Sequence, residues 1–233
     1  MAAGDLRIGG VEPFSTVDFP GHLAAVVFCQ GCPLNCGYCH NPDLIPATAD
    51  GLMDFEAVLA AIEARAGFID GVVFSGGEPL AQAALAEAVD RVRALGLAVA
   101  LHTAGTSPAR LQQVLPRLSW VGFDIKAPFD GYGPVTGVTP AGRKALASLE
   151  RLIASGVDHE VRTTVWPERI GADALRRIVF ALEQVGVRRF VLQECRTPDR
   201  KTWPGGSALD DTALMAELGA PFAEFEVRRV QSR

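Results

Sequence analysis

The sequence from residue 29 to residue 39 reads Cys29-Gln-Gly-Cys32-Pro-Leu-Asn-Cys36-Gly-Tyr-Cys39. It holds four of the five cysteines of this 233-residue chain. The apolar run that precedes it, residues 24–28, is typical of a buried strand, so the cysteines are expected in the loop at the C-terminal end of that strand. In a reducing compartment, such a group of cysteines indicates a metal or cofactor site before it indicates disulfides.

The rest of the chain alternates short apolar runs with amphipathic segments. Because buried parallel strands are almost continuously apolar, strands are predicted at 23–29, 71–75, 97–103, 120–125, 158–165 and 188–193. Helical periodicity predicts helices at 54–65, 81–95, 108–115, 140–154 and 172–185.

Local stop and start signals agree with this division of the chain. Gly96, Gly156 and Gly186 each fall between a helix and a strand, where a left-handed cap is expected. Ser107-Pro108 and Thr139-Pro140 both predict an N-cap residue followed by proline at the first helical position.

About six β–α units in one chain predict an α/β fold with a parallel sheet and right-handed crossovers. Six units are fewer than the eight of a closed barrel, so we expect an open, partial (β/α)6 barrel with its chemistry at the C-terminal ends of the strands. Residues 1–233 are expected to form a single domain with a core at about 10–193. Residues 194–233 would add a loop at 197–206, a helix and an edge strand at 222–230.

Composition excludes several classes of protein. Hydrophobic residues make up 48% and charged residues 21%, which fits a globular protein and not a disordered one. The net charge of −5 gives no basic excess that would meet nucleic-acid phosphates. No apolar run is long enough to span a membrane, and the N-terminus lacks the pattern of a secretory signal. We therefore expect a cytoplasmic protein that binds neither nucleic acid nor membrane.

Cys32, Cys36 and Cys39 are the candidate ligands of a [4Fe–4S] cluster, because three close thiolates can hold one side of the cube and leave one iron open. Structural zinc is the first alternative, but the two Cys-x-x-Cys pairs lie too close together for a zinc ribbon. A thioredoxin-like pair of Cys29 and Cys32 is the second, and it leaves the other two cysteines unexplained. Cys29 can serve as a small hydrophobe, and the distant Cys195 is expected to be packed.

This spacing of cysteines, with the aromatic Tyr38 before the last one, resembles the radical S-adenosylmethionine (SAM) superfamily. The resemblance implies that Cys32, Cys36 and Cys39 hold a [4Fe–4S] cluster that cleaves SAM. Residues 74–79, Phe-Ser-Gly-Gly-Glu-Pro, strengthen it, since a glycine pair lets a ligand approach the backbone. By resemblance, Gly76, Gly77 and Glu78 would contact the methionine amino group of SAM.

Polar residues stand near the ends of three further strands, at His102, Asp124, Lys126 and Arg162. A buried cation is costly unless it is paired, so a single one could be a structural ion pair. Polar groups at successive strand ends point instead to one polar ligand across the barrel mouth. Arg162 or Lys126 would suit the carboxylate of SAM, and Asp124 or His102 its ribose or ammonium group.

Two further stretches resemble the glycyl-radical-enzyme activases within this superfamily. One is Cys39-His40-Asn41-Pro42, which adds His40 to Tyr38 as a candidate cofactor-binding residue, and the other is residues 14–21 with the Phe-x-Gln-Gly-Cys phrase at 28–32. The resemblance covers about residues 10–193 and is greatest to the activator of anaerobic ribonucleoside-triphosphate reductase. It implies that an electron from flavodoxin or ferredoxin drives SAM cleavage and that the resulting radical takes hydrogen from a glycine of the partner enzyme.

The sequence departs from this group at two positions and leaves other functions open. His102 stands where pyruvate formate-lyase activators tend to have Asp, and Cys29 stands where an apolar residue is usual, so Cys29 could replace Cys32 as a ligand. The alternatives are an activase of another glycyl-radical enzyme, of the pyruvate formate-lyase type, or a small-molecule enzyme such as a 7-carboxy-7-deazaguanine synthase. A redox or binding module that carries a cluster without SAM chemistry is a further alternative.

Overall fold

A single curved sheet organises the chain in a computed structural model that describes residues 2–196 and 207–229. Its eight strands lie in sequence order, and all neighbouring pairs are parallel except β1 with β2. The strands are β1 (Ile8–Ser15), β2 (Ala24–Cys29), β3 (Gly71–Gly76), β4 (Ala98–Thr103), β5 (Trp120–Asp124), β6 (His159–Val165), β7 (Arg189–Glu194) and β8 (Glu224–Arg228). The expected loop at 197–206 lies outside the described residues.

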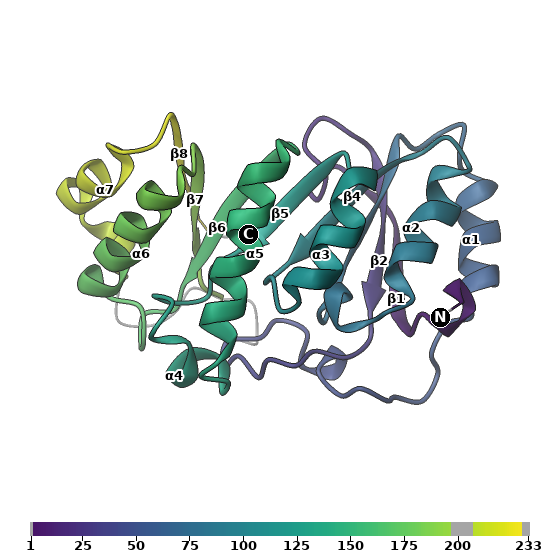
Figure 1. Ribbon diagram of the computed structural model, residues 1–233, viewed down its shortest axis with the longest axis horizontal. Coiled ribbons are helices and arrows are strands. Elements are labelled where there is room, and N and C mark those ends of the chain that lie inside the picture. The colour runs from purple at the N-terminus through teal and green to yellow at the C-terminus, as the bar shows by residue number, and fades with distance from the viewer. Residues whose placement is uncertain (1, 197–206, 230–233) are drawn as a thin grey trace.

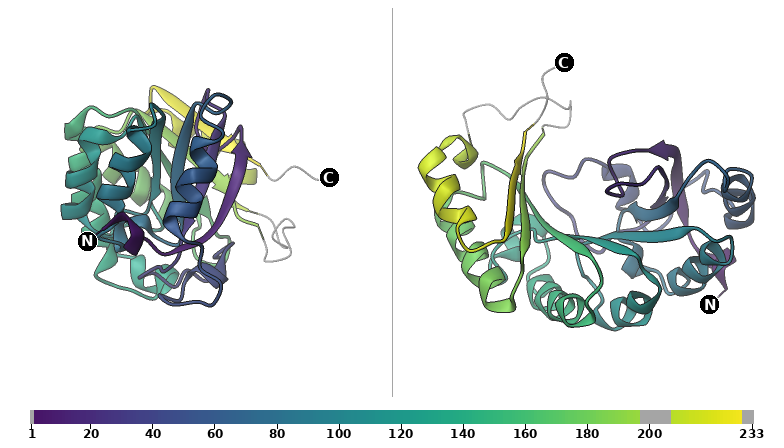
Figure 2. Two further views of the ribbon diagram at one scale, coloured as in Figure 1. Left: turned by 90° about the vertical axis from the view of Figure 1, so that its right-hand side faces the viewer. Right: turned by 90° about the horizontal axis from the view of Figure 1, so that it is seen from above.

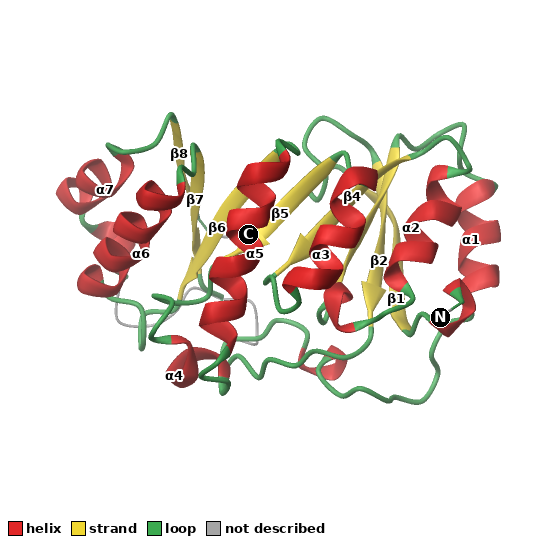
Figure 3. Cartoon of the chain, in the orientation of Figure 1, coloured by secondary structure: helices red, strands yellow, loops and turns green. Residues whose placement is uncertain are grey.

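The helices lie on the outer side of the curved sheet, and none of the helices described covers its inner face, as the right-hand view of Figure 2 shows. They are α1 (Phe55–Glu63), α2 (Leu85–Arg93), α3 (Pro108–Val114), α4 (Tyr132–Thr136), α5 (Ala141–Ser155), α6 (Ala172–Val185) and α7 (Thr212–Gly219) (Figure 3). None of the helices described is long and apolar enough to cross a membrane.

Two apolar clusters follow from the alternation of side chains along the strands. Ala25, Val27 and Cys29 of β2 face the helices and belong to the large outer core. Val26 of β2 faces the other way, into a small inner cluster with Phe19, Val73, Ala100 and Trp120. Because alternate residues of a strand point to opposite faces, the inner face is available to polar groups wherever this cluster ends.

The open, partial α/β barrel predicted from the sequence is confirmed, and each of the six predicted inner strands is present. Gly156 and Gly186 are left-handed C-cap residues with φ of 70° and 85°. Gly96 is also left-handed, but it lies in the turn after α2, whose C-cap is Ala94. Ser107 is the N-cap of α3, although its side chain makes no capping hydrogen bond.

One predicted N-cap is wrong. The N-cap of α5 is Pro140, one residue later than the predicted Thr139. The side chain of Thr139 packs instead against Gly133 of α4, where a methyl group would stand 2.7 Å from Thr139 Oγ1.

Strand β1 was not predicted, and it adds an antiparallel edge to the sheet beside β2. Its sequence contains Gly9, Gly10 and Pro13, which weaken any strand pattern. An edge strand tolerates proline because one side of its backbone needs no partner in the ladder. Pairing fixes the strand here, since Ile8 lies opposite Cys29 and is fully buried.

Candidate active site

The cysteine cluster occupies the loop that leaves the C-terminal end of β2. Cys29, the last residue of the strand, is fully buried against the helices, and burial raises the pKa of its thiol to about 12. Cys32, Cys36 and Cys39 lie beyond the strand and are partly exposed. The structure therefore separates one packed thiol from three accessible ones in a single loop.

The start of this loop is fastened to the segment that follows it. The backbone N–H groups of Gly31 and Cys32 donate to the carbonyls of Leu44 and Ile45 at 2.9 and 3.0 Å. The Gln30 side chain donates to two further carbonyls of the same segment, at residues 43 and 46. These bonds fasten the start of the cysteine loop to residues 43–46.

The glycine pair at the end of β3 lets this loop approach closely. Gly76 has φ of 105°, and a methyl group there would stand 2.5 Å from the backbone nitrogen of Cys29. A methyl group on Gly77 would stand 2.6 Å from the carbonyl oxygen of Gly31. Side chains are thus excluded at both positions, because the cysteine loop and the end of β3 meet backbone to backbone. The packing of the two loops is a reason for glycine at both positions, in addition to the ligand contact expected from the sequence.

The carboxylate of Glu78 is engaged within the protein. It accepts hydrogen bonds from Thr103 Oγ1 at 2.6 Å, from the Ala104 N–H at 2.9 Å and from the Leu80 N–H at 3.0 Å. The residue is 1% exposed, and burial raises the pKa of the carboxyl group against these three hydrogen bonds. Glu78 therefore ties the end of β3 to the end of β4.

An ion-pair network lies on the inner face where the last residue of β5, Asp124, pairs with Arg162 in the middle of β6. Asp124 accepts from Arg162 Nε at 2.8 Å and from Lys126 Nζ at 3.2 Å. Burial opposes ionisation of Asp124, but the two cations outweigh it and hold its pKa well below the usual range. Burial by itself lowers the pKa of Lys126. The nearby Asp124, Tyr38 and Cys36 raise it by more, so the pKa of Lys126 lies well above its usual value. Lys126 is thus charged at neutral pH, and it shares the Asp124 carboxylate with Arg162.

Gly122 makes room for this network. Its position on β5 lies between Trp120 and Asp124 on the same face, and a methyl group there would stand 2.9 Å from Arg162 Cζ and Trp120 Cη2. The Arg162 side chain therefore lies across β5 to reach Asp124. No signal in the sequence marks this glycine, because the need for it arises from a side chain of the neighbouring strand.

His102 lies deeper on the same face. One ring nitrogen, Nε2, lies 2.8 Å from the carbonyl oxygen of Asp18, so it must carry the proton, and the ring packs edge-on against Trp120. Burial, with Arg162 nearby, lowers the pKa of His102 to about 4. The ring is therefore neutral at pH 7 and offers Nδ1 as an acceptor. The contribution of Asp18 was not predicted, since it comes from a backbone carbonyl.

Tyr38 connects the cysteine loop to this network. Its ring is buried, lies under Lys126 Nζ at 5.9 Å from the centroid, and is tilted against Trp166 at 5.7 Å. Among the described residues its hydroxyl has no hydrogen-bond partner. His40, which follows Cys39, is exposed. The structure thus brings the three thiols, Tyr38 and Lys126 to one edge of the sheet, with His40 on the outside of the loop.

The donor set fits an iron–sulfur cluster with SAM beside it. Three accessible thiols come from one loop, the ring of Tyr38 in that loop lies under Lys126, and Lys126 and Arg162 share the Asp124 carboxylate. Burial raises the pKa of Cys32 to about 12, so cluster binding would have to displace its proton. Within the described residues, no three His, Cys, Asp or Glu side chains converge as on one metal ion. A cube does not require that convergence, because each thiolate binds a different iron.

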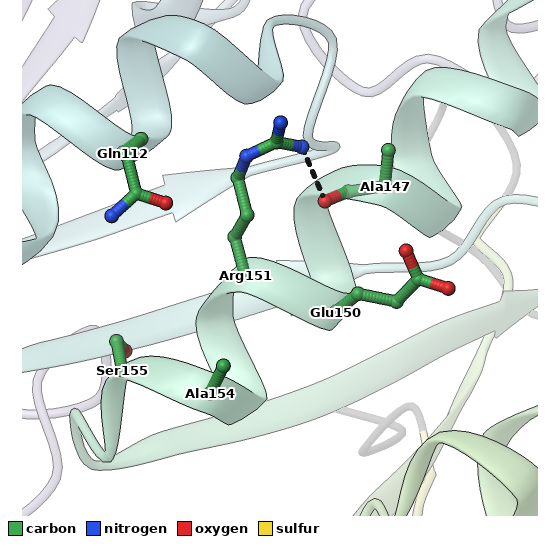
Figure 4. Close-up of a pocket in the computed structure, with 6 residues that line it drawn as sticks. All are labelled: Gln112, Ala147, Glu150, Arg151, Ala154 and Ser155. Carbon is green, nitrogen blue, oxygen red and sulfur yellow. Dashed lines mark hydrogen bonds between the residues drawn. The ribbon is translucent and has the colours of Figure 1, made fainter.

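A surface hollow lies elsewhere, between α3 and α5 on the outer layer of the molecule (Figure 4). It is lined by Gln112 of α3 and by residues of α5, where Arg151 donates to the carbonyl of Ala147 at 2.9 Å. It contains none of the predicted site residues.

Sequence comparisons agree with the site. The family model of the Radical SAM superfamily matches residues 26–176. A Methanocaldococcus jannaschii protein named as a glycyl-radical enzyme activating enzyme is 30% identical over 168 residues, which is 69% of this chain and 69% of that protein. The pyruvate formate-lyase-activating enzyme of Clostridium pasteurianum is 36% identical over 137 residues, which covers 56% of this chain and 57% of the relative.

Solved structures share the fold at low identity. SuiB of Streptococcus suis bound to S-adenosylmethionine superposes with a TM-score of 0.66 at 12% identity, covering 88% of this chain and 49% of SuiB. QueE from Escherichia coli superposes with a TM-score of 0.57 at 20% identity, covering 98% of this chain and 94% of QueE. These likenesses concern the arrangement of strands and helices.

Proposed function

The chain belongs to the Radical SAM superfamily and is a homologue of glycyl-radical enzyme activating enzymes, and from this membership we propose that its partner is an anaerobic ribonucleoside-triphosphate reductase. Enzymes of this superfamily use a [4Fe–4S] cluster and SAM. The observation that supports SAM chemistry in this chain is the meeting of three accessible thiols, the Gly76-Gly77 pair and the shared ion pair of Asp124 at one edge of the sheet.

We assign the cluster to Cys32, Cys36 and Cys39, and leave Cys29 to the core. When bound, the cluster and SAM supply reductive cleavage to methionine and a 5′-deoxyadenosyl radical. The chain's own part is to bind, orient and shield these groups. The backbone of Gly76 and Gly77, beside the cysteine loop, is assigned to the amino-acid end of SAM.

The cations and the neutral histidine are assigned to the remaining polar groups of SAM. Lys126 and Arg162 would bind its carboxylate, because each has donors beyond the one bonded to Asp124. Asp124 and His102 would accept hydrogen bonds from the ribose hydroxyls or the ammonium group, since Nδ1 of His102 is an acceptor. Tyr38 and His40 are assigned to the same site, on the two sides of Cys39. Glu78 would act by holding the ends of β3 and β4.

The reductase is favoured as the partner over pyruvate formate-lyase by the short chain, by the segments Val-Asp-Phe-Pro-Gly at 17–21 and Val-Arg-Thr-Thr-Val at 161–165, and by His102, which stands where the formate-lyase activators tend to have Asp. We further propose that flavodoxin or ferredoxin supplies the electron, in the cytoplasm, where free thiols persist. The second candidate is an activase of a pyruvate formate-lyase, which the Clostridium relative favours.

The test is anaerobic mixing of the reconstituted chain, a reductant, SAM and each candidate partner, followed by electron paramagnetic resonance. We expect the doublet of a glycine α-carbon radical on the reductase, lost when its radical-bearing glycine is replaced by alanine. Cys36→Ala is the matched control and should form no 5′-deoxyadenosine. A radical on pyruvate formate-lyase alone would transfer the assignment to the second candidate. Cleavage of SAM without a radical on either protein would favour a small-molecule substrate.

A further inference from the structure

A residue of the cysteine loop that is not a candidate ligand packs against a tryptophan from another element. Gly37, between Cys36 and Tyr38, lies against the indole of Trp166, a residue that the sequence analysis did not single out. A methyl group at Gly37 would stand 2.6 Å from Trp166 Cη2 and 3.2 Å from Cζ3. Because the indole is 8% exposed and rigid, it cannot move aside as a flexible side chain would. This contact requires glycine between the second and third cysteines.

Trp166 is itself held in place. It follows the end of β6 directly, and its carbonyl oxygen accepts from the N–H groups of Ile170 at 2.7 Å and Arg169 at 3.0 Å. The Arg169 guanidinium lies 5.9 Å from the centre of the indole ring, and Tyr38 packs against the ring at 5.7 Å. The indole is therefore a fixed surface that joins the cysteine loop to β6, the strand that carries Arg162.

The loop is held from a second side by α4. The N–H of Asn35 donates to the carbonyl of Thr136 at 2.8 Å, and the N–H of Gly37 donates to the carbonyl of Val135 at 3.4 Å. These carbonyls belong to the last turn of α4, where they have no partner inside the helix. Gly37 thus has its backbone bonded to α4 and its Cα against Trp166.

We propose that Trp166 is a positioning residue for the cluster: its indole, with α4 opposite, fixes Gly37 and so sets where the thiolates of Cys36 and Cys39 point. This inference rests on the proposed function, since it needs the cluster. Groups outside the metal ligands commonly orient them, and their loss typically costs roughly 10–100-fold in metal affinity. A tryptophan that only filled the core would change the stability of the apoprotein and leave the cluster's spectrum unchanged.

The test compares Gly37→Ala, Trp166→Leu and the double variant with wild type after anaerobic reconstitution. We expect each single variant to lose iron to a chelator roughly 10–100-fold faster and to shift the resonance of the reduced cluster. The double variant should recover wild-type retention in part, because leucine leaves room for the added methyl group. Gly171→Ala is the matched control, since no atom lies within 4 Å of a methyl group there.

The variants also separate this inference from the function on which it rests. Circular dichroism and thermal unfolding of the apoproteins would show whether each single variant folds. Wild-type iron retention and resonance in Trp166→Leu would overturn the proposal even if Gly37→Ala failed to fold. A double variant no better than Gly37→Ala would also overturn it, because the steric contact would not be the cause. A wild-type chain that took up no cluster would overturn the proposed function as well, whereas loss confined to the variants would leave that function standing.

Discussion

At the scale of single residues, burial distinguishes cysteines that the sequence places almost side by side. Cys29 ends a strand and faces the helices, whereas Cys32, Cys36 and Cys39 are partly exposed in the loop. Replacing Cys29 by alanine removes one buried sulfur, which costs about 1 kcal/mol of stability through the small cavity it leaves.

We therefore expect Cys29→Ala to retain about four irons per chain after reconstitution, as a [4Fe–4S] cluster requires. Cys32→Ala, Cys36→Ala and Cys39→Ala should each lose the cluster. Iron and sulfide analysis with the visible spectrum measures this. Retention of iron in Cys32→Ala together with its loss in Cys29→Ala would show that Cys29 is the ligand instead.

Glu78 acts on the ends of two strands at once, so its removal should be felt in stability. In Glu78→Ala, the Leu80 and Ala104 N–H groups and the Thr103 hydroxyl lose their acceptor. Each buried donor left unpaired costs about 1–3 kcal/mol. We expect Glu78→Ala to lower the free energy of unfolding of the apoprotein by at least about 3 kcal/mol, and to bind SAM weakly because Gly76 and Gly77 shift. Glu78→Gln, which keeps one acceptor oxygen, should lose less stability and less SAM affinity than Glu78→Ala. Equal unfolding midpoints for Glu78→Ala and wild type would contradict this role of Glu78.

His102 should make the protein less stable in mild acid. Its pKa falls from 6.5 to about 4 on folding, so between these values the unfolded chain binds more protons than the folded one. The stability that the neutral ring provides is complete above about pH 6.5 and is lost progressively down to about pH 4, in total on the order of 3 kcal/mol. His102→Gln can still donate to the Asp18 carbonyl but does not titrate, so its denaturant midpoint should fall less than that of wild type over this range. Parallel pH profiles of the two proteins would exclude His102 as the cause.

At the scale of elements, the sequence predicted the parallel strands because each is buried on both faces and therefore continuously apolar. It missed β1, whose glycines and proline are acceptable only because Ile8 and its neighbours pair with β2. It also missed α4, because a helix of 5 residues is too short to show helical periodicity. A strand or helix can therefore be predicted from its own sequence only when its formation does not depend on pairing with a neighbouring element.

The site divides in the same way. Motif spacing and unexpected polarity were enough to single out Cys32, Asp124, Lys126 and Arg162 from the sequence. The sequence could not predict Gly122 and Trp166, because their importance arises from side chains that reach them from other elements. For Glu78 the type of residue was informative, but its three hydrogen-bond donors became visible only in three dimensions.

Strand β8 is joined to the sheet by an ion pair that spans β7. Arg228 binds both carboxylate oxygens of Glu160 on β6 at 2.7 Å, and Glu160 is 1% exposed. Arg189 of β7 adds a contact to the same carboxylate at 3.2 Å. Removing Arg228 would leave the buried charge with one cation instead of two.

We expect Arg228→Ala to lower the free energy of unfolding by roughly 1–3 kcal/mol and to speed hydrogen exchange in β8 before the rest of the sheet. Arg91→Ala is the matched control, because Arg91 makes a bidentate ion pair of the same kind with Glu56, at 2.9 and 2.8 Å, on the surface. Its removal should have a smaller effect, since exposed pairs contribute little. An equal effect of the two substitutions would show that burial of Glu160 is not what matters.

At the scale of the whole molecule, the inner face of the sheet changes character from one half to the other. Over β2–β5, away from the strand ends that carry His102 and Asp124, it is apolar, and Phe19 from the β1–β2 loop fills it, stacked on His22 with ring centres 4.0 Å apart. Over β6–β8 it carries Glu160, Arg189 and Arg228, and the two arginines remain about one-third exposed. Among the described residues, β8 is the edge strand of the sheet on this side (Figure 2). A substrate that enters from this side would meet charged side chains and an edge strand, which suit a protein segment, whereas a small molecule needs an enclosed pocket.

If a glycine loop of the partner reaches the strand ends by this route, its hydrogen should pass directly to the nucleoside. We therefore expect that a partner reductase whose glycines carry deuterium on the α-carbon will transfer the label into 5′-deoxyadenosine, as mass spectrometry of the nucleoside would measure. In the same sample, the doublet of the glycine radical should collapse, because the splitting comes from the α-hydrogen that remains. A reductase labelled in the same way, with its radical-bearing glycine replaced by alanine, should transfer no deuterium. A radical on the labelled partner with unlabelled 5′-deoxyadenosine would mean that hydrogen comes from another site first, and the open edge of the sheet would then not be the place where the glycine reacts.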